Sequence, residues 1–171
     1  MSTLRRVSFD EPGTVPGDGV LHPVVLLAIG LLIINDHLLK AVAPGWWTGK
    51  LSDLAGLAFA PIVLQAAWEL ATARRGSWRP SPTVLLVAIA VTGAGFAAVK
   101  LIPPAAALYG AALGALQWPF HAMAALLDGS AMPGVLVAPV ASDPTDLLAL
   151  VGLAVAYAVG TTRIRAAAGA C

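Results

Sequence analysis

Residues 21–43 read LHPVVLLAIGLLIINDHLLKAVA, and this stretch decides the class of the protein. It contains no acidic residue, lysine or arginine before Asp36, and about 20 apolar residues are enough for a helix to cross the hydrocarbon of a bilayer. Polar side chains gather near its end, at Asn35, Asp36, His37 and Lys40. The stretch therefore predicts a membrane-spanning helix with a polar cluster toward one end.

The composition of the whole chain agrees with a membrane protein. Of its 171 residues, 58% are hydrophobic and 11% are charged, and the mean hydropathy is +0.83. Soluble domains carry about 25% charged residues, so a soluble fold is excluded. Because every backbone group in lipid must be bonded internally, we expect an all-α fold, a polytopic transmembrane helix bundle.

Charge and cysteine content exclude several kinds of partner. The net charge of +1 offers no basic surface for nucleic acid. The single cysteine, Cys171, allows no internal disulfide and no cysteine-based metal cluster. The chain also lacks the signatures of a P-loop, a zinc protease and a serine hydrolase. The sequence therefore assigns no cofactor, no metal site and no reaction.

The types of residue change along the chain. Residues 1–20 are rich in proline, glycine and acidic side chains, which predicts a disordered cytoplasmic tail. Residues 21–163 are expected to form a single transmembrane helical domain. Residues 164–171 are expected to form a short C-terminal tail.

Four apolar stretches are expected to cross the membrane as helices. They are residues 21–43, 51–73, 83–101 and 146–162. A further stretch, residues 105–127, is long enough to cross once, but Pro119 removes a backbone donor within it. We therefore expect a re-entrant or broken segment there, such as a hairpin of two short helices. Five full spans are the alternative.

The basic residues favour four spans. The seven arginines form three clusters, near residues 5–6, 74–79 and 163–165, and the three lysines lie between the first and last of them. With four spans, all arginines lie on one side and all lysines on the other, whereas five spans leave no bias. Loops rich in lysine and arginine stay in the cytoplasm, so we expect a cytoplasmic N-terminus in the cell (plasma or inner) membrane.

The four-span topology gathers most of the membrane-associated polar residues at the extracytoplasmic helix ends. Asp36 and Lys40 are four residues apart, hence neighbours on one helix face, which allows an ion pair. Charges inside membrane helices are costly and by default indicate a function. The candidate catalytic residues are Asp53 and His37. The candidate ligand-binding residues are Asp36, Lys40, Lys50, Lys100, Asp143 and Asp146.

Two segments resemble each other, and each begins a predicted span. They read KLSDLAGL at residues 50–57 and DPTDLLAL at residues 143–150. The similarity indicates either a diverged helical-hairpin duplication or a coincidence. Ser52 and Asp143 are also suited to cap the helices that follow them, so capping is an alternative to a ligand site.

Small residues four apart allow close approach of helices. Gly110 and Gly114 form such a pair, and so do Gly56 and Ala60. These faces serve either contacts within the bundle or a homo-oligomer.

Three functions are compatible with this pattern. In the first, the Asp, His and Lys cluster near the extracytoplasmic face binds or processes an anionic lipid headgroup or another phosphate-bearing ligand. In the second, Asp36, His37 and Asp53 relay protons in a small proton-coupled transporter or carrier. In the third, the charges are caps and ion pairs of a structural or assembly subunit. The lipid bilayer is a partner in all three.

Overall fold

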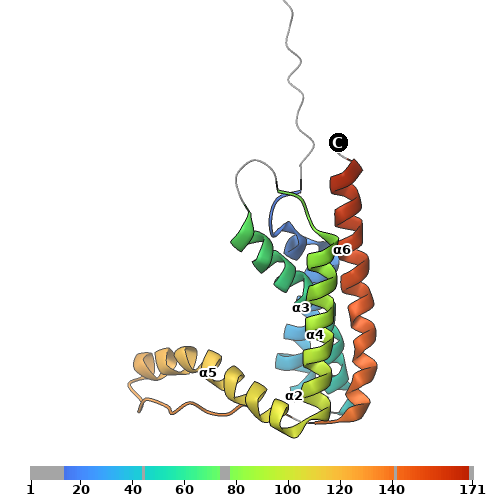
Figure 1. The fold of residues 1–171 in the computed structure, drawn as a ribbon. Helices are drawn as coiled ribbons and strands as arrows, with labels where there is room; N and C mark the ends of the chain where they lie inside the picture. Colours follow the sequence, from blue (N-terminus) through green and yellow to red (C-terminus); the bar gives the residue numbers. More distant parts are fainter. Residues whose placement is uncertain (1–13, 44, 74–77, 141, 170–171) are drawn as a thin grey trace, which may run out of the picture. The chain divides into compact units, whose positions relative to one another are not determined.

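The computed structural model describes residues 14–43, 45–73, 78–140 and 142–169. Within these residues every regular element is a helix, so the all-α class is confirmed (Figure 1). The elements are η1 (Asp18–Leu21), α1 (Pro23–Ile34), η2 (Asn35–Leu39), α2 (Lys40–Val42), α3 (Trp46–Thr72), α4 (Pro82–Leu101), α5 (Pro103–Asp128), η3 (Pro144–Val151) and α6 (Gly152–Gly169). The elements η1 and η3 are 3-10 helices, and η2 is a π-helix. The residues that carry predictions but lie outside the described ranges are Arg5, Arg6, Arg74, Arg75 and Cys171.

Four helices of the described chain are long and apolar enough to cross a membrane. They are Pro23–Val42 (which joins α1, η2 and α2), Trp46–Thr72, Pro82–Leu101 and Pro144–Gly169. Each overlaps one of the four predicted spans, and α5 is not among them. The chain therefore fits a multi-pass membrane protein with four spans.

Large apolar side chains lie on the outside of these helices. On α1, Leu27 is 72% exposed and Ile33 is 54% exposed. Monomeric soluble proteins rarely expose contiguous apolar surface of this kind. In a bilayer the same side chains contact lipid.

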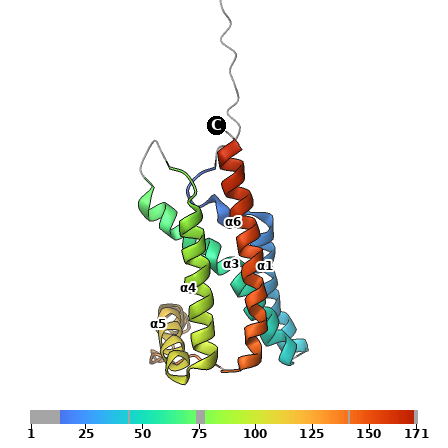
Figure 2. The ribbon, with the colours of Figure 1, turned by 45° about the vertical axis from the view of Figure 1, so that its right-hand side comes forward.

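The described chain divides into two compact units, and the first contains α1, α3, the beginning of α4 and α6. Its apolar core is formed by Val25, Ile62, Leu85, Ala156 and Val159. Helix α3 packs against both α1 and α6 (Figure 2), and helices approach closely at glycines. A Cβ atom at Gly152 would lie 2.6 Å from the carbonyl oxygen of Leu54. The contact between α3 and α6 therefore depends on a glycine at position 152.

Residues 14–20 lead into the first span through a turn and the beginning of η1, and the disordered cytoplasmic tail stays a prediction. Gly17 adopts a left-handed conformation with a φ of 83°, and η1 follows it. The backbone N–H of Gly17 donates to Oε2 of Glu69 on α3 (3.0 Å), and Asp18 pairs with Arg163 on α6. The polar groups of this segment therefore bond to charges that the helices bury.

Arg163 brings distant parts of the first unit to one end. It pairs with Asp18 before α1 and with Glu69 near the end of α3. Its guanidinium also lies 5.2 Å from the ring of Trp78, shortly before α4. The last span therefore ends where the first begins, which requires an even number of crossings. Five full spans would place Arg163 on the opposite side of the membrane from Asp18.

The second compact unit, residues 93–148, contains the end of α4, α5 and the chain that follows α5. Helix α5 is continuous with Pro119 inside it, so the predicted hairpin of two short helices is wrong. Pro119 removes one backbone hydrogen bond, whereas a full break would leave several polar groups unpaired in an apolar environment. Gly129, with a φ of 66°, ends the helix in the left-handed conformation usual at this position.

Residues 130–140, the return segment, run back along α5 in extended conformation (Figure 1). The N–H of Ala138 donates to the carbonyl oxygen of Gly110 (3.0 Å), and the indole N–H of Trp118 donates to that of Pro133 (2.8 Å). At the end of this excursion, Asp146 pairs with Lys100 of α4 (2.7 Å). The chain thus leaves the end of α4 and returns to it. A re-entrant position of this segment in the membrane stays a prediction.

Gly110 and Gly114 serve the contact with the return segment. A Cβ atom at Gly114 would overlap the carbonyl oxygen of Leu136, and one at Gly110 would lie 2.5 Å from that of Ala138. This face of α5 is therefore occupied within the chain. A homo-oligomer through other small-residue faces stays a prediction.

Cysteine labelling tests the even number of spans. We expect Cys171 and a cysteine at position 2 (Ser2→Cys in a Cys171→Ser background) to react with a membrane-impermeant maleimide from the same side of sealed vesicles. The reason is that Arg163 holds the end of the last span beside the beginning of the first. Both cysteines should react after detergent is added, which is the control. Labelling from opposite sides would contradict the four-span structure.

Substitution of Gly114 tests the packing of the return segment. We expect Gly114→Ala to lower the free energy of unfolding by about 1–3 kcal/mol, the usual cost of overpacking. Gly95→Ala on α4 is the matched control, since nothing lies within 4 Å of a Cβ atom there. Both variants would be unfolded in detergent micelles. Equal stability of the two would show that the return segment does not pack on Gly114.

Candidate functional site

A π-helical turn places the polar cluster of the first span against α3. In η2, the backbone N–H of Lys40 bonds to the carbonyl oxygen of Asn35, five residues earlier. Such turns are rare and occur frequently at functional sites. The turn contains Asp36 and His37, two of the predicted site residues.

Asn35 connects the turn to the beginning of α3. Its side chain is fully buried, and its Nδ2 donates to the carbonyl oxygen of Thr48 and to Oγ of Ser52, each at 2.6 Å. Ser52 in turn donates to Oδ1 of Asp36 (2.6 Å). Because α3 begins at Trp46, Ser52 lies inside the helix, and the prediction that it caps the helix is wrong. Its hydroxyl belongs to the polar network.

The network leaves one buried acceptor without a partner. Oδ1 of Asn35 is buried, and no described residue donates a hydrogen bond to it. An unsatisfied buried group of this kind costs about 1–3 kcal/mol. The two bonds donated by Nδ2 therefore hold the Asn35 side chain in place, while Oδ1 accepts none from a described residue.

Asp36 and Lys40 form the ion pair that their spacing predicts. Nζ of Lys40 lies 2.7 Å from Oδ1 of Asp36, and the two side chains are 42% and 38% exposed. Lys40 and Ser52 both bond to Oδ1, and no other described residue donates to Oδ2. The pair thus presents an acceptor oxygen and ammonium N–H groups to a ligand.

Aromatic and basic side chains surround the connection between the first two spans. Trp46 and Trp47 are both exposed, and the ammonium of Lys50 lies 5.9 Å from the centroid of the Trp46 ring. Tryptophan and lysine at helix ends are typical of the interface between bilayer and water. We call this surface the Trp46 rim, and it is formed by Asp36, Lys40, Trp46, Trp47 and Lys50.

The two predicted catalytic residues lie beside this network. Nδ1 of His37 is 3.1 Å from the carbonyl oxygen of Ile33 in its own helix. Asp53 is half-buried and lies three residues after Lys50. Because α3 begins at Trp46, both residues lie within this helix. A catalytic role for His37 and Asp53 stays a prediction.

In the second unit, Lys100 and Asp146 bind each other. Their side chains are only 11% and 12% exposed, and Nζ of Lys100 also lies 5.4 Å from the ring of Phe96. Asp143 accepts a hydrogen bond from the backbone N–H of Thr145 (2.8 Å), which agrees with the capping alternative. These three predicted ligand-binding residues therefore have partners within the chain.

A second set of charges is buried at the other end of the first unit. Nη1 and Nη2 of Arg163 bind the two carboxylate oxygens of Glu69 (2.8 and 3.0 Å). Nε of Arg163 bonds to Asp18, and Nη2 also donates to the carbonyl oxygen of Val15 (2.9 Å). Gln65 donates to Oε1 of Glu69 (2.9 Å), and both side chains are almost completely buried. All three guanidinium nitrogens are used, so this cluster is structural.

The sequence offers little sign of the Arg163 cluster. The partners of Arg163 are 94 and 145 residues away, so no local spacing relates them. The one signal is Glu69, an acid with Gln65 four residues before it in an apolar helix, because an acid within a membrane needs a partner.

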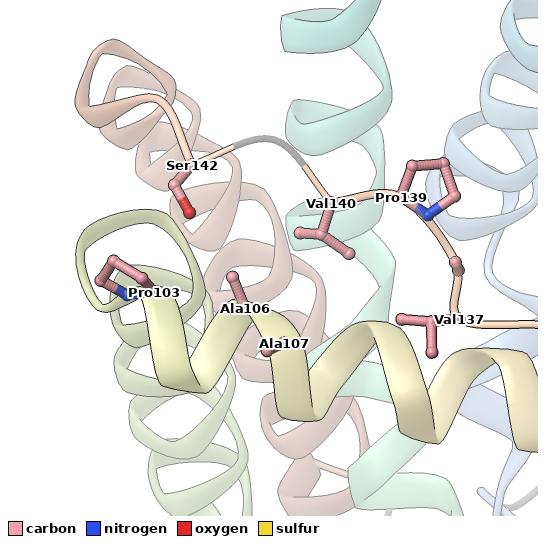
Figure 3. Close-up of a pocket in the computed structure, with 8 residues that line it drawn as sticks. Pro103, Ala106, Ala107, Val137, Pro139, Val140 and Ser142 are labelled. Atoms are coloured by element: carbon pink, nitrogen blue, oxygen red, sulfur yellow. The ribbon is translucent and has the colours of Figure 1, made fainter.

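The return segment and α5 enclose a groove of about 360 Å³ (Figure 3). Its lining is proline, alanine and valine with one serine, Ser142, whose hydroxyl donates to the carbonyl oxygen of Val99 (3.3 Å). The groove therefore brings no titratable group to a ligand. Across the described ranges, no three histidine, cysteine or acidic side chains are grouped so as to hold a metal ion.

No protein-family model, curated protein or solved structure matches the chain. The proposals below therefore rest on the geometry of the described residues.

Removal of the Arg163 charge tests the structural cluster. We expect Arg163→Gln to lower the free energy of unfolding by about 3–5 kcal/mol, because it leaves the carboxylate of Glu69 buried without a cation. The matched control is Arg165→Gln, since Arg165 lies on the same helix but is exposed. Denaturant unfolding in detergent micelles would measure both. A loss no larger than that of the control would show that the pair contributes little.

Proposed function

We propose that the Trp46 rim binds the phosphate group of a lipid headgroup. The observation that carries this proposal is the placement of two cations, Lys40 and Lys50, on either side of one short connection that exposes Trp46 and Trp47. A lysine ammonium is a compact charge with three donors, which suits a phosphate. The ammonium of Lys40 bonds to Asp36, and the Lys40 side chain remains 42% exposed.

The position of the rim suits a headgroup. Lys40 is two residues from the end of the first span, and Lys50 follows the start of α3 by four residues. The polar layer on each side of the hydrocarbon is about 5–7 Å thick. A lysine side chain near a helix end reaches this layer while its methylene groups stay in apolar surroundings.

The arginines support an outward orientation of the rim. They flank the opposite ends of the helices, and segments rich in arginine stay in the cytoplasm. Arg163 adds little to this signal because Glu69 and Asp18 neutralise it. The proposal of a cytoplasmic N-terminus in the cell membrane therefore rests on the remaining arginines.

The two alternative functions have less support. The predicted carrier would relay protons from Asp36, His37 and Asp53 along α3, where the side chain of Pro61 is fully buried. A structural subunit accounts for the Lys100 pair and for the Arg163 cluster. It gives no reason for an exposed Asp36 and Lys40 pair beside a buried, unsatisfied Asn35.

Neutralising the two lysines tests the proposal. We expect the double variant Lys40→Gln, Lys50→Gln to bind phosphatidylglycerol about 30-fold more weakly, since each lysine near a lipid surface contributes about 1 kcal/mol. Native mass spectrometry of the delipidated full chain, titrated with the lipid, would measure the affinity. Arg165→Gln removes an equal charge from an exposed site at the other end of the unit and should leave the affinity unchanged.

A competition arm identifies the source of the phosphate. Inorganic phosphate at millimolar concentration should not displace the lipid if the headgroup is held together with its chains at the rim. Displacement would instead assign the site to free phosphate. Unchanged lipid affinity of a folded double variant would overturn the proposal and leave the structural subunit.

A further inference from the structure

We infer that the Trp46 rim selects a zwitterionic headgroup that carries a primary ammonium, the chemistry of phosphoethanolamine, over an anionic headgroup. This inference rests on the proposed binding of a lipid phosphate by Lys40 and Lys50. It adds that Asp36 accepts the ammonium of the same headgroup.

The first observation is the net charge at and beside the rim. Lys40 and Lys50 are accompanied by Asp36 in the same network and by Asp53 on the next turn of α3. The five residues of the rim alone carry a net charge of +1, and the half-buried carboxylate of Asp53 beside them brings the local sum to zero. An anionic lipid is attracted by an excess of positive charge, which this surface lacks. A ligand with both signs matches it better.

The second observation concerns the carboxylate of Asp36. Both of its hydrogen bonds, from Lys40 and Ser52, end on Oδ1, and no other described residue donates to Oδ2. Ser52 is itself held by Nδ2 of the fully buried Asn35. The acceptor is therefore fixed in position, and the side chain that carries it is 38% exposed.

The third observation is that headgroups differ in whether they can donate N–H bonds. A primary ammonium donates N–H bonds to a carboxylate, and such charge-assisted bonds are about twice as strong as neutral ones. The quaternary ammonium of phosphocholine has no N–H group, although it can lie over a tryptophan ring. Glycerol headgroups carry no cation. The free Oδ2 of Asp36 thus distinguishes ethanolamine from both.

A comparison of three lipids with identical acyl chains tests the inference on the unaltered protein. The delipidated full chain is titrated with phosphatidylethanolamine, phosphatidylcholine and phosphatidylglycerol and followed by native mass spectrometry. We expect phosphatidylethanolamine to bind about tenfold more tightly than either of the others, as one additional charge-assisted hydrogen bond implies. Equal affinities, or a preference for choline or glycerol, would overturn the inference without the need for any variant.

A variant of Asp36 assigns the preference to its carboxylate. Asp36→Asn should reduce the preference for ethanolamine to within about twofold, because a neutral amide loses the charge-assisted bond. Binding of phosphatidylglycerol should become tighter, since Lys40 is released from its partner. Asp128→Asn, which removes an exposed carboxylate outside the rim, is the control and should retain the preference. Full retention by a folded Asp36→Asn would also overturn the inference.

The lysine double variant separates this inference from the proposed function. Weaker binding of all three lipids by Lys40→Gln, Lys50→Gln supports the phosphate site. If that loss occurs while the unaltered protein shows no preference for ethanolamine, only the selectivity fails. If the double variant binds all three lipids normally, the phosphate site itself fails.

Discussion

The buried guanidinium of Arg163 constrains the path of the whole chain. A charge among apolar helices is tolerated only when it is paired, and Arg163 finds its acids in Glu69 on α3 and in Asp18 before α1. Because Asp18 precedes the first span and Glu69 lies near the end of the second, the last span must end where the first begins. The same contacts join residues 14–18, which have no apolar core of their own, to the helices. Span number and the fold of the N-terminal segment thus have one electrostatic cause.

The ion pairs of this protein differ in how many of their polar atoms already bond to other groups of the protein. Arg163 has all its nitrogens bonded, and Lys100 and Asp146 are nearly buried against each other. These pairs join residues that are far apart in the sequence and expose little charge to a ligand. The Asp36 and Lys40 pair is exposed, and both of its protein bonds meet at one oxygen. Of these three groups, it is the one whose geometry suits an external partner.

The sequence predicts local features well and long-range ones poorly. Hydropathy locates the four spans, and a separation of four residues predicts the Asp36 and Lys40 pair. The partners of Arg163 lie too far along the chain for any spacing rule. Pro119 misleads because a proline removes one backbone hydrogen bond, and α5 continues through it with the bonds on either side intact. Hydropathy also places the start of the second span after Lys50, whereas α3 begins at Trp46. It therefore misses that Ser52 is too far from the helix start to cap it and accepts a bond from Asn35.

The distribution of the basic residues and the contacts of Arg163 independently favour an even number of spans. Counting basic residues favours four spans because all arginines then share one side, and this argument uses no contact between helices. The contact of Arg163 with Asp18 requires an even number of spans without reference to any charge bias. Arg163 is one of the seven arginines, but its charge is neutralised by Glu69 and Asp18. It therefore supports the even number of spans through its contacts and adds little to the charge bias. The proposed orientation then rests on the arginines at the opposite helix ends from Lys40 and Lys50, which is why we propose an outward-facing Trp46 rim.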